Sequence, residues 1–264
     1  MPLIKQLERL LSLRADARLL AYARILVGVS AVAAAFELWR LLPRVLDPLV
    51  IQLPYALAVP RLPKAALPIF IGVWLLVALA FTSGFKTRLA GALLTAMSWY
   101  TLLLDQQTYS NHFYLLCLLM LLVTLADSGA ALSIDALTRG TRKTVAGWPV
   151  MLLKLQASIV YGFSALAKLT PQYLSGDVLA ATMKQPGWLM QTSGVSLLAV
   201  SAIVVELFIA FGLWSSRLRV AAVIAGVALH VFIFATLDSS RLSLGMFALE
   251  MFALYPLFFQ RSDV

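Results

Sequence analysis

Residues 148–169 read WPVMLLKLQASIVYGFSALAKL, a run that is apolar nearly throughout and about one bilayer crossing long. Two lysines interrupt this run, Lys154 and Lys168, and their spacing brings both near one face of a helix. A lysine inside a bilayer is costly unless it snorkels, pairs or faces water. We expect Lys154 to snorkel. Lys168 precedes the polar loop 170–177, where a partly desolvated amine could exchange protons.

The composition is typical of a helical membrane protein that crosses the bilayer several times. Of 264 residues, 61% are hydrophobic and 12% are charged, and the mean hydropathy is +0.90. The formal net charge of +9 lies in short loops between apolar runs, so it indicates membrane topology and no nucleic-acid partner. The single cysteine, Cys117, can form no intrachain disulfide. We expect one all-α transmembrane domain over residues 1–264.

Eight apolar segments are predicted to be spans of a polytopic helical bundle. They cover residues 22–42, 67–83, 89–104, 112–126, 149–169, 195–214, 220–237 and 242–259. Before them, Leu3, Leu7, Leu10 and Leu11 share one helical face, which predicts an amphipathic surface helix within residues 1–21. The first span follows no small-residue cleavage site and is expected to be retained. Residues 43–64 and 170–194 read as irregular excursions.

The lysines and arginines predict the orientation of the chain. Eight spans place both termini on one side, and assigning the loops in turn puts thirteen basic residues on that side and seven on the other. The positive-inside rule therefore predicts cytoplasmic termini. Residues 105–112, Lys168 with its following loop, and the turn at Asp238 then lie on the outer face. We expect a bacterial plasma membrane with an extracytoplasmic site; in a eukaryote this face would be an organelle lumen.

Few residues in the spans could carry chemistry. The chain has no phosphate-binding glycine loop, no HExxH motif and no paired cysteines, and two histidines are too few to predict a metal site. Glu37, Glu206 and Glu250 lie within apolar segments, so each must be neutral or paired with Lys, Arg, His or Tyr. Such carboxyls are either structural hydrogen-bonding groups between spans or parts of a proton path or polar cavity.

His112 and Lys168 each admit a structural interpretation, as an interfacial polar histidine and a snorkelling lysine. His230, inside an apolar segment, reads by itself as a satisfied core histidine. The topology nevertheless places His112 and Lys168 on the same membrane face, which favours a shared functional site.

Several short motifs resemble, in order and spacing, those of the vitamin K-dependent gamma-carboxylase family, whose membrane part is the HTTM domain. Ser110–Tyr114 (SNHFY) resembles its Asn-His-x-Tyr element, and residues 132–135 (LSID) resemble its Ser-Val-Asp element. Further similarity lies at Gln156, residues 159–161, residues 167–169, Tyr173, Gly176, Glu206, residues 244–247 and residues 256–258. The resemblance extends over residues 24–259, nearly the whole chain.

The resemblance implies an enzyme that couples oxidation of a lipid quinol to carboxylation of a peptide glutamate. Lys168 matches the catalytic base and His112 the functional histidine of the family. Asn111, Tyr114, Glu206 and His230 are implied to bind the cofactor, reduced vitamin K or another lipid quinol, with molecular oxygen and carbon dioxide as co-substrates. Burial favours a neutral lysine amine, the form that acts as a base. A membrane site would also keep water from a carbanion.

The sequence departs from the family at two points. Ala167 stands where the family has the first lysine of its pair, and the chain ends at Val264, whereas the animal carboxylase continues into a large lumenal domain. Peptide recognition would therefore fall to the two excursions or to a partner subunit on the outer face. Two functions other than carboxylation remain open: a membrane maturation or accessory factor for a secreted peptide, and a quinone-binding subunit.

Overall fold

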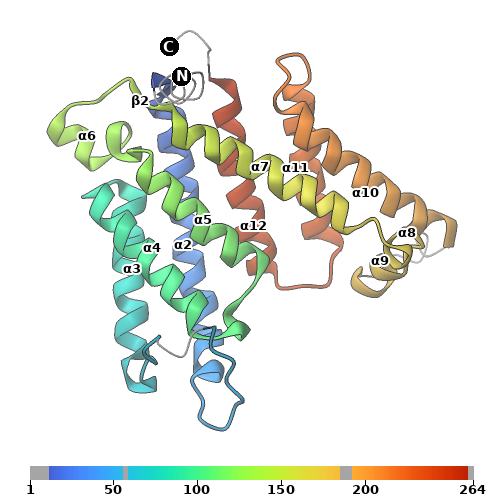
Figure 1. Cartoon of the computed structure of the whole chain (residues 1–264), viewed down its shortest axis with the longest axis horizontal. Helices are drawn as coiled ribbons and strands as arrows, with labels where there is room; N and C mark the ends of the chain where they lie inside the picture. Colours follow the sequence, from blue (N-terminus) through green and yellow to red (C-terminus); the bar gives the residue numbers. More distant parts are fainter. Residues whose placement is uncertain (1–11, 56–58, 185–191, 261–264) are drawn as a thin grey trace, which may run out of the picture. The chain divides into compact units, whose positions relative to one another are not determined.

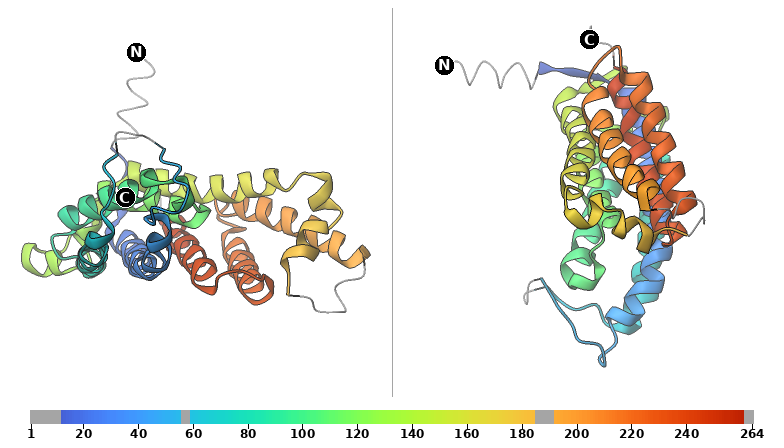
Figure 2. Two further views of the ribbon diagram at one scale, coloured as in Figure 1. Left: turned by 90° about the horizontal axis from the view of Figure 1, so that it is seen from below. Right: turned by 90° about the vertical axis from the view of Figure 1, so that its right-hand side faces the viewer.

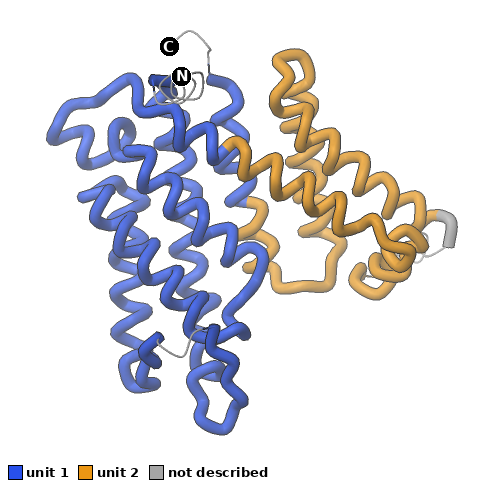
Figure 3. The backbone as a smooth tube through the Cα atoms, in the orientation of Figure 1, with its two compact units in different colours: residues 1–153, 249–264 blue, residues 154–248 orange. Residues whose placement is uncertain are grey.

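The computed structural model describes residues 12–55, 59–184 and 192–260, and most of them are helical (Figure 1). The backbone divides into two compact units (Figure 3). Unit 1 comprises residues 1–153 and 249–264, and unit 2 comprises residues 154–248. Each unit is described by itself below.

Unit 1 is built on four long helices: α2 (Ala17–Val45), α3 (Leu67–Ser83), α4 (Thr87–Leu104) and α5 (Asn111–Leu125). Helix α2 packs against α3 and α5, and α4 packs against α3 and α5. Small side chains let α2 and α3 approach closely, since a Cβ at Gly28 would lie 2.3 Å from the Thr82 hydroxyl oxygen. The Trp74 indole is fully buried in the same contact and donates to the Ala31 carbonyl at 2.8 Å.

Short elements complete this unit. Strand β1 (Arg14–Asp16) pairs antiparallel with β2 (Thr144–Ala146), with Arg14 opposite Ala146. The loops contain α6 (Ile134–Arg139) and four 3-10 turns: η1 (Lys64–Ala66), η2 (Gln106–Thr108), η3 (Ser128–Ala130) and η4 (Tyr255–Phe259).

A fully buried arginine of α2 donates hydrogen bonds to the chain at and just after η3. Arg24, within α2, donates to the carbonyls of Ser128, Ala131 and Leu132 at 2.7, 3.3 and 2.5 Å. Sequence reasoning counted Arg24 only as a topology signal. Its guanidinium instead satisfies loop carbonyls that would otherwise be buried without donors.

Unit 2 contains most of α7 (Gly147–Ala167) and the first part of α12 (Arg241–Leu254), which both continue into unit 1. Between them lie α8 (Pro171–Leu174), α9 (Asp177–Thr182), α10 (Thr192–Gly212) and α11 (Arg219–Thr236). Helix α10 packs against α8, α9 and α11, as two further views show (Figure 2). The buried cluster here consists of Ala165, Tyr173, Ala199 and Ile203.

Each of the eight predicted spans is helical in the structure. Among the described residues, six helical segments are long and apolar enough to cross a membrane: Ala17–Val45, Lys64–Ser83, Gly147–Ala167, Gly194–Gly212, Arg219–Thr236 and Arg241–Phe259. The chain is therefore an integral, multi-pass membrane protein. Helix α5 is apolar but shorter, and α4 is not among the six.

Three boundaries differ from the sequence expectation. Residues 1–11 of the predicted surface helix lie outside the described residues, while residues 14–16 form β1 and α2 already begins at Ala17. Helix α2 also continues past Pro43, which the sequence placed in an excursion. Within 170–194, residues 171–174 and 177–182 form two short helices rather than irregular chain. In helices this short, the sequence pattern covers too few turns to be distinguished from that of a loop.

Hydrogen bonds between loops show which helix ends lie together within each unit. In unit 1, the Leu53 amide, in the loop after α2, donates to the Asp105 carboxylate, which follows the last residue of α4. In unit 2, Lys184 N donates to the Thr236 carbonyl and Asp238 N to the Thr182 carbonyl, which joins the loop after α9 to the turn after α11. Both contacts join helix ends that the sequence predicts to lie on the same side, because successive spans run in opposite directions.

Candidate functional site

Lys168 lies just beyond the C-terminal end of α7 and pairs with Glu206 of α10. Its Nζ donates to Oε1 and Oε2 of Glu206 at 2.5 and 2.7 Å, and to the Ser164 hydroxyl oxygen at 2.6 Å. Ser164 in turn donates to Glu206 Oε1 at 2.9 Å. Because Ser164 precedes Lys168 by one helical turn, both side chains face α10. The lysine side chain is 22% exposed and the glutamate side chain 6% exposed, so the pair is largely withdrawn from solvent.

A cavity of about 480 Å³ opens beside this pair, entirely within unit 2. Lys168, Glu206 and Ser164 form a polar part of its wall. Most of the remaining lining is aliphatic or aromatic and comes from α9, α10 and α11: Val178, Leu179, Leu198, Val205, Leu229, Phe232 and Ile233. A largely apolar cavity with one concentrated polar group suits an amphiphile whose polar end reaches the ion pair.

Tyr173 adds an aromatic wall next to the lysine. The Thr170 hydroxyl accepts from the Tyr173 amide at 3.3 Å and caps α8, which holds the tyrosine in the buried cluster. Lys168 Nζ lies 5.8 Å from the centroid of its ring. Burial, together with the charge of Glu206, raises the pKa of Tyr173 to about 12. The phenol therefore keeps its proton near neutral pH.

His230 of α11 lies behind this wall. It is 3% exposed, its Nε2 lies 2.9 Å from the Tyr161 hydroxyl, and its ring meets the Phe247 ring at 5.4 Å between centroids. Phe247 lines the cavity, whereas His230 does not. His230 can therefore influence a bound molecule through Phe247, rather than by the direct contact that the resemblance implied.

His112 belongs to unit 1, at the start of α5, and pairs with Glu37 of α2. His112 Nε2 lies 3.0 and 2.8 Å from the two carboxylate oxygens of Glu37, and 3.4 Å from the Ser110 hydroxyl oxygen. Ser110 caps the helix by accepting from the Phe113 amide at 3.4 Å. The histidine is 9% exposed. A carboxylate on one ring nitrogen selects the tautomer and orients the imidazole.

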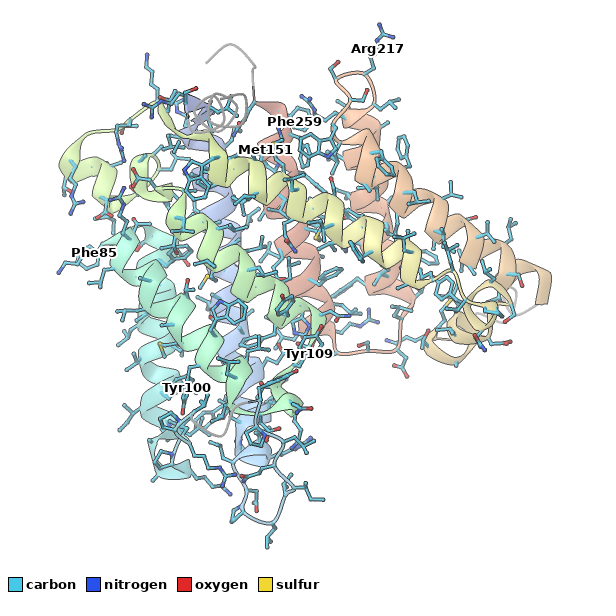
Figure 4. The ribbon with its side chains drawn as sticks, viewed as in Figure 1. Phe85, Tyr100, Tyr109, Met151, Arg217 and Phe259 are labelled. Carbon is cyan, nitrogen blue, oxygen red and sulfur yellow. The ribbon has the colours of Figure 1, made fainter. Side chains whose placement is uncertain are left out.

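Asn111 and Tyr114 lie on the same turn of α5 but turn to other partners. Asn111 is exposed and its Oδ1 accepts from the Tyr109 hydroxyl at 3.3 Å. The Tyr114 ring meets Trp99 edge-on at 6.1 Å and Tyr109 at 6.0 Å between centroids. Tyr109 is labelled in Figure 4. Asn111 and Tyr114 therefore have partners other than the His112–Glu37 pair, although they lie on the same helix as His112.

The predicted site residues fall into two groups. In unit 2, Lys168 and Glu206 line the cavity, and His230 contacts the lining residue Phe247 without lining the cavity itself. In unit 1, Asn111, His112 and Tyr114 lie at the start of α5. Sequence reasoning did not assign Ser164 or Tyr173. Helical spacing from Lys168 could have identified Ser164, whereas Tyr173 follows a break in the helix.

Two of the three acids in the apolar segments have partners of the kind that the sequence predicted for a charged carboxylate. Glu37 pairs with His112 and Glu206 with Lys168, as expected for carboxyls at membrane depth. Glu250, which is fully buried in α12, instead accepts from the Ser30 hydroxyl at 2.6 Å, and its Oε2 has no partner among the described residues. A serine from the facing helix was not among the expected partners.

Lys154, about two turns into α7 from its N-terminal end, packs on an aromatic ring. Its Nζ lies 5.1 Å from the Trp214 ring, and Trp214 donates to Ser158 at 2.7 Å. Among the described residues, no three His, Cys, Asp or Glu side chains are grouped so that they could hold a metal ion.

The order of the motifs and these paired residues can be compared with known families. A profile of the HTTM domain matches residues 14–262, which includes nearly the whole chain and both units. The chain belongs to the HTTM family. This domain is the membrane core of the gamma-carboxylase family, so the HTTM chain is a carboxylase-related membrane protein. No solved structure matches it.

Proposed function

We propose that the HTTM chain is a membrane enzyme that uses a lipid quinol, reduced vitamin K or a related molecule, to carboxylate a glutamate of a peptide. The observation that carries this proposal is the Lys168–Glu206 pair on the wall of an apolar cavity. The proposal includes eight spans, cytoplasmic termini and a reaction site on the outer face of a bacterial plasma membrane.

The residues of this cavity fit a quinol. The aliphatic lining from α10 and α11 would accept an isoprenoid-type tail, and the polar corner at Ser164, Lys168 and Glu206 would meet the ring hydroxyls. Tyr173 offers an aromatic face beside that corner, and its protonated hydroxyl can donate a hydrogen bond. His230, held by Tyr161, would fix the position of Phe247 on the opposite part of the wall.

Lys168 would act as the base through its contact with Glu206. An ammonium cannot accept a proton, but transfer of one proton from Nζ to Glu206 Oε1, 2.5 Å away, leaves a neutral amine beside a neutral carboxylic acid. In apolar surroundings the charged and neutral forms of such a pair lie closer in free energy than they do in water. The amine could then take a proton from a hydroxyl in the cavity, with Ser164 keeping Nζ oriented.

The carboxylation reaction of the family needs a stronger base than a lysine amine. Carboxylation breaks a C–H bond at the glutamate γ-carbon, releases one proton and forms a C–C bond to carbon dioxide. A bound quinol, oxidised by molecular oxygen to its epoxide with release of water, supplies the strong base that this weakly acidic C–H bond needs. The chain's own contribution is to bind, deprotonate and exclude water.

His112 and Glu37 would supply an oriented imidazole. Glu37 accepts from Nε2, so the other ring nitrogen, Nδ1, would be the hydrogen-bond acceptor available to a substrate. In the proposed reaction this group hydrogen-bonds oxygen-bearing species. Peptide binding would involve the chain around residues 46–63 and 170–184, or a partner subunit.

The test is quinol-dependent turnover by the full chain in lipid nanodiscs. Reduced vitamin K, labelled bicarbonate and a glutamate-containing peptide are supplied, and both epoxide and labelled peptide are measured. Lys168→Ala should abolish both products. Lys143→Ala is the matched control, because that lysine is exposed and lies outside both the cavity and the proposed peptide-binding segments. It should retain wild-type turnover.

Unchanged epoxide formation in Lys168→Ala would refute the role of this lysine. Absence of both products in the wild-type chain, with a quinone bound nonetheless, would favour a quinone-binding subunit. A bound peptide without a quinone would favour a maturation factor.

A further inference from the structure

A second cavity, of about 640 Å³, lies in unit 1 at the turn between α3 and α4. Phe85, labelled in Figure 4, marks this turn. Four basic side chains line the cavity: Lys86, Arg88, Arg139 and Arg142. They come from the start of α4, the end of α6 and the following loop. The positive-inside rule explains basic residues on this side of the membrane, but it does not require them to converge on one cavity.

The two carboxylates in the lining are already engaged. Asp127 pairs with Arg142 and, at 3.3 Å, with Arg88. Asp135 accepts from the amides of Lys86 and Thr87 and from the Thr87 hydroxyl at 2.8–2.9 Å. Lys86 and Arg139 have no carboxylate oxygen within ion-pair distance in the described part of the chain. The lining therefore has two more positive than negative side chains.

The backbone around this cavity is held in unusual conformations. Among the described residues, only three non-glycine residues have positive φ, and two of them, Lys86 at 43° and Asp127 at 57°, line the cavity. Such conformations cost about 1–3 kcal/mol each and persist where surrounding contacts enforce them. Here Asp135 enforces the first by binding the Lys86 amide.

An exposed apolar side chain beside the basic ones points to the membrane interface. Leu89 lines the cavity and is 56% exposed, whereas Leu137 of α6, 85% exposed, lies outside the lining. The α3–α4 turn follows a helix that is long and apolar enough to span the bilayer, so the cavity lies where that helix leaves the membrane. A basic pocket beside an exposed leucine matches a phosphate group that carries hydrocarbon chains.

We propose that this cavity binds an anionic phosphate group, supplied by the headgroup of an anionic phospholipid. Lys86 and Arg139 hold the phosphate as free cations, while Arg88 and Arg142 are kept in place by Asp127. Leu89 contacts the first part of the acyl chains. The site is separate from the Lys168 cavity and does not depend on carboxylase activity.

Native mass spectrometry of the detergent-solubilised full chain tests this proposal. Phosphatidylglycerol and phosphatidylcholine with identical acyl chains are titrated, and the apparent Kd of each is measured. One basic residue near an anionic lipid surface contributes about fivefold in affinity, so the double variant Lys86→Gln/Arg139→Gln should bind phosphatidylglycerol about 25-fold more weakly. Binding of phosphatidylcholine should not change. Both side chains are exposed, and among the described residues neither has a carboxylate oxygen within ion-pair distance, so the variant breaks no ion pair there.

Arg14→Gln/Lys143→Gln is the matched control. It removes the same charge from exposed positions at the same end of unit 1, outside the cavity lining. Retained affinity in this control, with loss in the cavity variant, supports the site. Equal loss in both variants, or no loss in the cavity variant, overturns it, because binding would then reflect general surface charge.

Inorganic phosphate distinguishes the two sources of the ligand. If millimolar phosphate displaces phosphatidylglycerol from the wild-type chain, and itself binds the wild-type chain but not the cavity variant, the site accepts a soluble phosphate. Failure of phosphate to compete, with the variant result as expected, assigns the site to a lipid headgroup.

Discussion

Lys168 Nζ lies 2.5 Å from Oε1 of Glu206, on the wall of a largely apolar cavity. An isolated charge in apolar surroundings is far more costly than a pair, so each side chain stabilises the charge of the other. The contact therefore explains how α10 can contain a buried carboxyl at membrane depth. It also concentrates the polarity of the cavity at one corner.

Removing one member of this pair should destabilise the protein. In Glu206→Gln the Lys168 ammonium keeps only the Ser164 hydroxyl and a neutral amide as partners. We expect the free energy of unfolding to fall by about 1–3 kcal/mol, less than for a fully buried pair because the lysine is partly exposed. Unfolding in mixed detergent micelles, followed by circular dichroism, measures this change.

A double variant separates the pair from its surroundings. Glu206→Gln/Lys168→Met removes both charges and should recover part of the lost stability, since no unpaired charge remains. The free energy of unfolding lost by the double variant is compared with the sum of the losses in Glu206→Gln and Lys168→Met. A larger loss in the double variant than this sum would contradict an attractive contact.

The Glu37–His112 contact should be measurable by a double-mutant cycle. Glu37→Gln and His112→Gln each remove one member, and the coupling between them should be about 1–2 kcal/mol, as for a hydrogen bond that involves a charged group. The same unfolding measurement applies. A coupling near zero would show that the two side chains are independent despite their 2.8 Å approach.

Asp135 should make stability depend on acid pH. Burial of this carboxyl opposes its ionisation, but hydrogen bonds from Thr87 and Lys86 and the charge of Arg139 outweigh burial and lower its pKa from 3.8. The unfolded chain thus binds the proton more tightly than the folded chain. The stabilising contribution is complete above the unfolded pKa and is lost as pH falls through the lower, folded value.

Asp135→Asn should therefore lose stability at pH 7, and the difference from the wild type should narrow as the pH falls below about 4. The measurement is the free energy of unfolding of both proteins across pH 7 to 3. Asp238→Asn, a change in an exposed turn of unit 2, is the control for removing one carboxylate elsewhere in the chain. An Asp135→Asn deficit that does not vary with pH would contradict the linkage.

Two glycines should respond to alanine in opposite directions. Gly84 ends α3 with φ of +72°, and a Cβ there would lie 2.3 Å from the Ser133 Cβ and 2.9 Å from its Cα. Gly84→Ala should therefore cost more than about 1 kcal/mol, from strain and the displaced backbone together. A Cβ at Gly72, within α3, would meet no atom within 4 Å. Gly72→Ala should stabilise the helix by about 0.5–1 kcal/mol. Equal effects of the two changes on the thermal midpoint would contradict this account.

The existence and order of the long helices could be predicted from the sequence because apolar runs of bilayer length are local patterns. Short elements were less accessible. Strand β1 contains only three residues, and its partner β2 lies in a distant loop, so no local period marks either. Helices α8 and α9 are four and six residues long, which is too short for a helical repeat to be evident.

The sequence by itself determined that Glu37, Glu206 and Glu250 must be either neutral or paired, because an unpaired carboxylate is costly at membrane depth. It also identified Lys168 and His112 as candidates, and the family to which the chain belongs. Only the tertiary structure decided that Glu206 meets Lys168, 38 positions earlier, that Glu37 meets His112, 75 positions later, and that Glu250 meets Ser30. The physical reason is that such pairs depend on how far each helix is rotated and shifted against its neighbour, which is set by the packing of small and large side chains across the whole contact.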